Sequence, residues 1–218
     1  MCLKALNSGK VPITMIKFTQ CLDVLHNVSD VDERIQSLSQ SEYMSEADNY
    51  PGTRRYEPPE FTDVKQRVSD VILENYPAIV EITSMSFSLQ HQPEHLDMPG
   101  IIHRDPSVLN FVLYMDTEFQ PHRGTTLYHN TYHRPITLEQ DLLDATHVGQ
   151  TSVSEHVLPY NQAFLDSEYC EFQPVYNSLA LFPGYIMHGR NKNQSLPQLP
   201  RSFFVGFIRS AEVKIGTT

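Results

Sequence analysis

The sequence predicts a mainly β protein in which short antiparallel strands form a sandwich or barrel, with helices packed outside it. From residue 101 onward, β-branched and aromatic runs of four to eight residues alternate with polar turns. Fifteen Pro, eleven Tyr and eleven Phe also favour turns and aromatic-rich strands over a helical bundle. A chain of 218 residues suits one domain, 1–218, that is large enough to bury a sizeable core.

The first part of the chain, residues 1–98, reads as a mixed helical and strand region that packs on the core. Val28–Leu38 carries apolar residues at helical spacing, with Ser29 and Asp30 as N-terminal caps. Asp63–Tyr76 predicts a second helix that Pro77 ends. Its apolar stripe is formed by Val64, Val68, Val71 and Ile72. Residues 42–59 are polar and read as turns or an ordered loop, and 78–89 as β-like.

Residues 99–210 hold the predicted β core. The strands we expect are Val108–Met115, Thr125–His129, Ser178–Phe182 and Arg201–Ile208. Within the last of these, Gly206 indicates a bulge or a close approach of two backbones. The irregular stretch 132–166 resembles an insertion, with a helix around 138–145.

Composition argues against several functions. The net charge is −10 and the isoelectric point is near 5.4, which disfavours binding to a nucleic-acid backbone. Three scattered cysteines lack Cys-x-x-Cys spacing, so neither a disulfide framework nor a zinc ribbon is expected. No stretch reaches the roughly 18–20 apolar residues of a membrane span. We therefore expect a cytoplasmic protein without membrane contact.

One motif carries metal chemistry. In a strand, His103 and Asp105 project to the same face while Arg104 projects to the other. His188 follows the Pro183-Gly184 turn and supplies a second imidazole. Two imidazoles and one carboxylate leave three positions of an octahedral Fe(II) open, as in the facial triad of non-haem iron oxygenases. A lone His-x-Asp arises often by chance, so the conjunction with His188 carries the prediction.

Arg201 strengthens this hypothesis. It opens the otherwise apolar strand Arg201–Ile208, where burying a guanidinium is costly without an anion. A planar guanidinium matches a carboxylate through two parallel hydrogen bonds, so Arg201 suits the far carboxylate of a 2-oxoacid. A structural ion pair is the alternative, and Arg190 and Arg209 are weaker rivals for the same role.

These motifs resemble the 2-oxoglutarate/Fe(II)-dependent oxygenase superfamily over roughly residues 50–210. The Gly-Thr-x-x-Tyr strand and the Tyr50–Arg54 loop are similar to a bacterial and phage subgroup. Only the iron triad and Arg201 are specific. The matching segments are Pro99–Asp105, Phe111–Met115, Gly124–Tyr128, Asn177–His188 and Arg201–Ile208.

The resemblance implies a double-stranded β-helix, or jelly roll, that uses Fe(II), 2-oxoglutarate and O2 and releases succinate and CO2. It places His103, Asp105 and His188 on iron and Arg201 on the distal carboxylate of 2-oxoglutarate. Hydroxylation of a small molecule or an amino-acid-type substrate is the reaction it implies. Three residues on core strands could donate to a carboxylate of 2-oxoglutarate: Asn110, Tyr114 and Tyr128. In the Pro-Gly loop, Arg54 could reach an anionic group of the substrate.

The chain departs from the family pattern at two places. Many relatives carry Gly-Gly-Thr where this chain has Arg123-Gly124-Thr125, and Arg-x-Ser where this chain has Arg201-Ser202. Two other functions therefore stay open. One is a facial-triad iron enzyme that does not use 2-oxoglutarate, with Arg201 on the substrate's own carboxylate. The other is a non-catalytic jelly-roll binding module.

Overall fold

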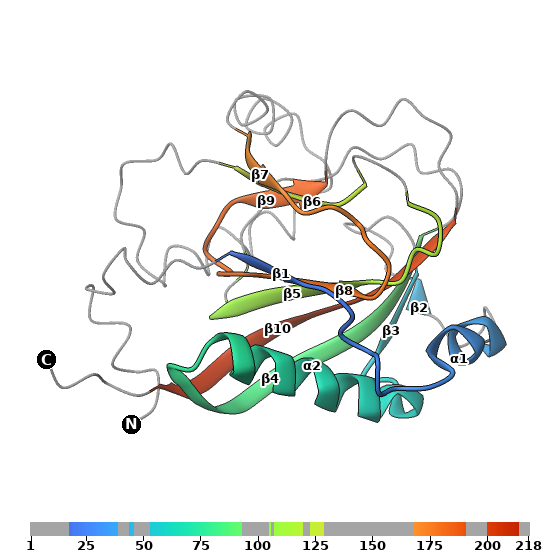
Figure 1. The fold of residues 1–218 in the computed structure, drawn as a ribbon, viewed down its shortest axis with the longest axis horizontal. Helices are drawn as coiled ribbons and strands as arrows, with labels where there is room; N and C mark the ends of the chain where they lie inside the picture. The colour runs from blue at the N-terminus through green and yellow to red at the C-terminus, as the bar shows by residue number, and fades with distance from the viewer. Residues whose placement is uncertain are drawn as a thin grey trace, which may run out of the picture.

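A computed structural model describes residues 18–38, 44–45, 53–92, 105, 107–119, 123–128, 168–190 and 200–213. These residues form two antiparallel sheets and two α-helices (Figure 1). The strands are β1 (Thr19–Cys21), β2 (Met44–Ser45), β3 (Thr53–Tyr56), β4 (Ile79–Gln92), β5 (Leu109–Tyr114), β6 (Thr125–Tyr128), β7 (Glu168–Glu171), β8 (Ser178–Phe182), β9 (His188–Arg190) and β10 (Arg201–Val213). The helices are α1 (Val31–Ser37) and α2 (Thr62–Asn75), the latter preceded by a 3₁₀ turn at Pro59–Phe61.

The strand order defines a jelly roll. The large sheet has the order β1-β8-β5-β10-β4-β3-β2, and the small sheet has the order β7-β6-β9. From β5 to β10 the chain crosses repeatedly between the two sheets, as it does in double-sheet jelly rolls. The predicted fold is confirmed. Strands from the first 98 residues pair directly with core strands, β4 with β10 and β1 with β8.

Alternation along the large sheet separates two faces. The odd positions of β5, with Leu109, Phe111 and Leu113, join the core cluster under α2. The even positions Val112 and Tyr114 join a second cluster that faces the small sheet. The large sheet therefore lies between α2 and the small sheet (Figure 1). Of the predicted polar residues, Asn110, Tyr114 and His188 lie in the space between the sheets.

Both predicted helices are present. α2 buries the predicted stripe: Val64, Val68, Val71 and Ile72. Its last backbone hydrogen bond runs from the Tyr76 N–H to the Ile72 carbonyl, one residue before Pro77. None of the helices in the described part of the chain is long and apolar enough to cross a membrane. The helix predicted at 138–145 and the insertion at 132–166 lie outside the described residues.

Two details refine the sequence reading. Within the predicted loop 42–59, residues Thr53–Tyr56 form β3, so that interpretation was wrong for this segment. The strand was missed because two arginines replace the apolar residues of an alternating pattern, and pairing with β4 stabilises it instead. At Gly206 the expected close approach is confirmed, since a Cβ there would lie 2.1 Å from the Ser86 carbonyl oxygen. The irregular register lies further along β10, beyond Ile208.

Candidate metal centre and anion site

The segment around Asp105 is fixed by the turn that precedes His188. The Asp105 N–H donates to the Gly184 carbonyl at 2.9 Å, and the Ser107 N–H donates to the Asp105 carbonyl at 2.8 Å. A Cβ at Gly184 would lie 2.0 Å from Ser107 Oγ and 2.8 Å from the Asp105 carbonyl oxygen. Only a residue without a side chain lets these two segments touch.

His188 opens β9 with its ring buried between the sheets, 6% exposed. Its Nδ1 lies 2.8 Å from the Ile186 carbonyl, which can only accept, so Nδ1 carries the hydrogen. A neutral ring with its hydrogen on Nδ1 has the lone pair on Nε2. This is the tautomer that binds a metal through Nε2. The ring packs on Phe182 with centroids 4.8 Å apart, which holds its plane.

His188 and Asp105 meet at the spacing of two metal ligands. His188 Nε2 lies 3.0 Å from Asp105 Oδ2. Two donors about 2.1 Å from one octahedral ion, at right angles to each other, lie about 3.0 Å apart. The donor pair therefore fits a shared divalent ion in both chemistry and separation.

Asn110 supports this pair from β5. Its Nδ2 donates to Asp105 Oδ2 at 2.6 Å and lies 3.4 Å from His188 Nε2. The Ser107 hydroxyl donates to Asn110 Oδ1, which sets the orientation of the amide. The structure thus places Asn110 beside the donor pair, where it positions the carboxylate.

His103, the third predicted ligand, lies outside the described residues. Among the residues that the structure does describe, no group of three or more His, Cys, Asp or Glu side chains is placed to hold a metal. The described part of the predicted centre is Asp105 with His188.

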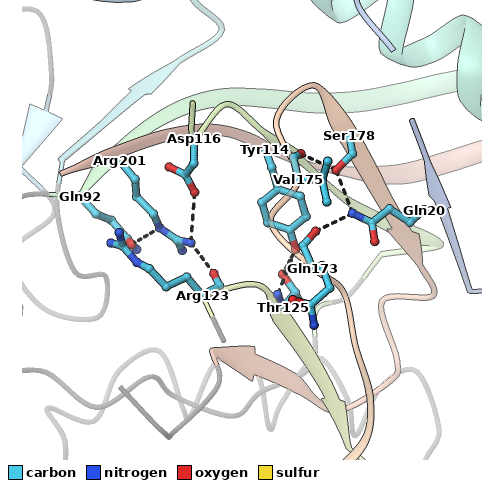
Figure 2. A network of polar contacts seen from close by, with 10 residues as sticks. All are labelled: Gln20, Gln92, Tyr114, Asp116, Arg123, Thr125, Gln173, Val175, Ser178 and Arg201. Carbon is cyan, nitrogen blue, oxygen red and sulfur yellow. Dashed lines mark hydrogen bonds and ion pairs between the residues drawn. The ribbon is translucent and has the colours of Figure 1, made fainter. Parts of the chain in front are cut away.

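Arg201 anchors a second polar cluster, at the start of β10 (Figure 2). Its Nε donates to Gln92 Oε1 at 2.7 Å, and one terminal nitrogen donates to the Arg123 carbonyl. The same nitrogen lies 3.9 Å from Asp116 Oδ2. The guanidinium stacks over the Phe203 ring at 4.6 Å. These contacts come from four separate segments and hold the cation buried, 8% exposed.

Burial disfavours the charged forms of Asp116 and Arg123 in this cluster. Desolvation raises the pKa of Asp116, although Arg201 and Arg123 act in the opposite direction. Desolvation and the neighbouring Arg201 lower the pKa of Arg123 to about 10. Two guanidiniums thus share one carboxylate that burial disfavours, an arrangement suited to receiving another anion.

Tyr114 lies on the same inner face and contacts the small sheet. Its hydroxyl donates to Thr125 Oγ1 at 3.0 Å and accepts from the Thr125 N–H at 3.0 Å (Figure 2). Burial raises the pKa of its phenol to about 12, so the hydroxyl stays a neutral donor. Tyr114 pairs with Phe203 on β10, two residues from Arg201, so it lies beside the cluster around Arg201.

Two further predicted residues lie elsewhere on the sheets. Tyr128, at the end of β6, is buried, and its N–H donates to the Met187 carbonyl beside His188. Arg54 lies in β3, so its assignment to a loop was wrong. It is 8% exposed and pairs across the sheet with Gln90.

Sequence reasoning missed several members of the site. Gln92 continues the alternation of β4 three residues beyond the predicted end of that strand, and this was the available signal. Arg123 was visible only as a departure from the family pattern. Asp116 follows β5 with no distinguishing motif.

No protein-family model matches the sequence, and no curated protein is significantly similar to it in sequence. Solved structures do match. HygX from Streptomyces hygroscopicus, with nickel and 2-oxoglutarate bound, gives a TM-score of 0.54 at 12% identity, over 89% of this chain and 84% of that one. An oxidoreductase of the 2OG-Fe(II) oxygenase family from Burkholderia pseudomallei gives 0.54 at 9% identity, over 95% and 89%. A prolyl hydroxylase from Trichoplax adhaerens, in complex with a hypoxia inducible factor peptide fragment, gives 0.51 at 11% identity, over 92% and 86%. The chain has the jelly-roll fold of the 2-oxoglutarate/Fe(II)-dependent oxygenases.

Gly184→Ala tests the contact that assembles the donor pair. We expect a loss of about 1–3 kcal/mol in unfolding free energy, because the methyl group enters the space of Ser107 and Asp105. Denaturant unfolding measures the loss, and Ala180→Gly in the same inner layer controls for a general change in strand stability. A stability equal to that of the unaltered protein would show that the two segments do not touch.

Asp116→Asn tests whether burial of the Asp116 carboxylate beside Arg201 costs stability. A carboxyl whose pKa is raised on folding contributes stability below its unfolded pKa and loses it as pH rises through its folded pKa. We therefore expect the neutral amide to raise Tm at pH 7.5, by about 2–4 °C for each kcal/mol gained. The gain should shrink as pH falls toward the carboxyl pKa. Glu118→Gln, an exposed change in the same loop, is the control, and a lower Tm at pH 7.5 would contradict the assignment.

Proposed function

We propose that this protein is an Fe(II)- and 2-oxoglutarate-dependent dioxygenase that hydroxylates a small molecule or an amino-acid-type substrate. The observation that carries the proposal is the pairing of His188 Nε2 with Asp105 Oδ2 at 3.0 Å inside a jelly roll. Solved 2-oxoglutarate oxygenases with the same fold support it.

Asp105 and His188, together with His103, would hold Fe(II). Bound iron would supply O2 activation, coupled to the decarboxylation of 2-oxoglutarate to succinate and CO2. The chain's own residues prepare the ligands for this role. The Ile186 carbonyl holds the His188 tautomer, and Asn110 holds the Asp105 carboxylate through a 2.6 Å hydrogen bond.

Arg201 would bind the distal carboxylate of 2-oxoglutarate. Gln92 and the Arg123 carbonyl already fix the direction of its guanidinium, so little side-chain entropy is lost when an anion binds. Arg123 adds a second positive charge in a poorly solvated environment, where charge pairs are stronger than in water. Tyr114, whose hydroxyl is neutral, would contact the bound cosubstrate between the metal and the cluster around Arg201.

An iron enzyme that does not use 2-oxoglutarate is the alternative function. A guanidinium held by Gln92 and the Arg123 carbonyl would equally suit the carboxylate of the substrate itself. Formation of succinate from 2-oxoglutarate separates the two functions, because only the dioxygenase produces it.

Asp105→Ala and His188→Ala test the metal assignment. We expect each variant to lose binding of stoichiometric Fe(II), because each removes one of the three proposed protein ligands of the ion. Anaerobic titration with Fe(II) and then 2-oxoglutarate, followed through the weak visible charge-transfer band, measures this. His26→Ala, an exposed histidine, is the control. Undiminished iron affinity in both variants would refute the ligand assignment.

Arg201→Ala tests the cosubstrate assignment. We expect 2-oxoglutarate binding to weaken by about 2–5 kcal/mol, as when one partner of a buried charge pair is removed. Fe(II) affinity should be retained. Arg209→Ala is the matched control, because Arg209 is exposed on the same strand. If isothermal titration gives the same 2-oxoglutarate affinity for both variants, another cation binds the carboxylate.

A further inference from the structure

The face of β4 that points between the two sheets adjoins the polar cluster around Arg201. Ser88, Gln90 and Gln92 share this face because they alternate along the strand. Gln90 lies across from Phe203 on β10 and from Arg54 on β3. Its neighbour Gln92 holds Arg201, so Gln90 is one strand repeat away from the cosubstrate carboxylate proposed above.

Gln90 stands apart from its neighbours on this face. Ser88 Oγ donates to the Val205 carbonyl at 3.1 Å, and Gln92 accepts from Arg201. Gln90 is 0% exposed, and among the residues that the structure describes neither its amide nitrogen nor its amide oxygen has a hydrogen-bond partner. Burying an amide in this state costs free energy, and folded proteins rarely tolerate it without a ligand or a water.

Arg54 is the charged neighbour of this amide. It pairs directly with Gln90 across the sheet, and its guanidinium lies 5.5 Å from the centre of the Tyr56 ring. One terminal nitrogen contacts the Tyr56 hydroxyl at 3.3 Å, so Tyr56 holds the side chain along the strand. Residues paired in this way have Cβ atoms about 4.5–5.5 Å apart.

We propose that Gln90 and Arg54 form the subsite for the primary substrate, and that this substrate is an anion carrying an amide next to its carboxylate. This inference rests on the proposed dioxygenase function. A glutamine side chain offers an NH2 donor group and a carbonyl acceptor, which match the C=O and N–H of another amide. A guanidinium matches a carboxylate. Because Gln90 and Arg54 are paired on neighbouring strands, a ligand that meets both side chains would carry the two groups within a few bonds of each other, as in an N-acyl amino acid or the carboxyl end of a peptide.

Three small probes test the chemistry of recognition. N-acetyl-L-alanine carries both groups, its methyl ester lacks the carboxylate, and O-acetyl-L-lactate replaces the amide N–H by oxygen. We expect the full-length protein to bind N-acetyl-L-alanine about tenfold more tightly than either analogue, about 1.4 kcal/mol. Isothermal titration needs no turnover, so a failure here leaves the iron and 2-oxoglutarate titrations intact. Equal affinity for all three probes, or no binding of any, would overturn the subsite.

Gln90→Leu separates a ligand-binding amide from a structural one. We expect this variant to lose about tenfold in affinity for N-acetyl-L-alanine and to gain thermal stability, with Tm rising by about 2–4 °C, since an unpartnered amide is removed. 2-Oxoglutarate affinity should not change. Gln90→Met, which conserves volume, repeats the test should leucine pack poorly.

Arg54→Met and Gln66→Leu complete the set. Arg54→Met should lower affinity for N-acetyl-L-alanine but not for its methyl ester, because only the former carries the carboxylate. Gln66→Leu is the matched control, since Gln66 is exposed on α2. A lowered Tm in both Gln90 variants would show that the amide supports the fold, and unchanged probe affinity would show that the amide does not contact the ligand. Either result would overturn the proposal.

Discussion

The candidate site depends on one close approach between two backbone segments. The Pro183-Gly184 turn rests on the segment that carries Asp105, joined by the hydrogen bond from the Asp105 N–H to the Gly184 carbonyl. β9 begins at His188, four residues after Gly184, so the His188 ring lies in the interior next to the Asp105 carboxylate. Because side-chain atoms at position 184 would overlap both Ser107 and Asp105, this geometry requires glycine. The strands supply the frame, and this contact sets the relative position of the two donors.

β5 connects the two polar regions of the interior. Asn110 near its start supports the donor pair, and Tyr114 at its end adjoins the cluster around Arg201. The two residues are four positions apart on the same face, about 13 Å along the strand. Val112 lies between them and is part of the apolar cluster between the sheets. The proposed dioxygenase function would use both regions, with the metal at the first and the distal carboxylate of 2-oxoglutarate at the second.

Sequence patterns were sufficient for the elements that bury apolar side chains. The stripe of α2 and the runs of β5 and β8 have the periodicity of their structure, so their bounds were predicted within one or two residues. β3 was missed because its arginines hide the pattern. At the site, the motif residues Asp105 and His188 were identifiable by type and spacing. The partners of Arg201 were not, because they come from segments whose proximity only the strand register determines.

The two polar regions differ in how fully their groups are satisfied. At the donor pair, His188 Nδ1, the Asn110 amide and the Asp105 carboxylate all have protein partners. Around Arg201, burial raises the pKa of Asp116 and lowers that of Arg123. On the adjoining face, the Gln90 amide has no hydrogen bond within the described part of the chain. Such features reduce stability unless something binds there, and a ligand that relieves them stabilises the folded state through its binding free energy. The proposed recognition of 2-oxoglutarate and substrate would therefore use the β4–β10 side of the interior, while the donor pair already has its protein partners.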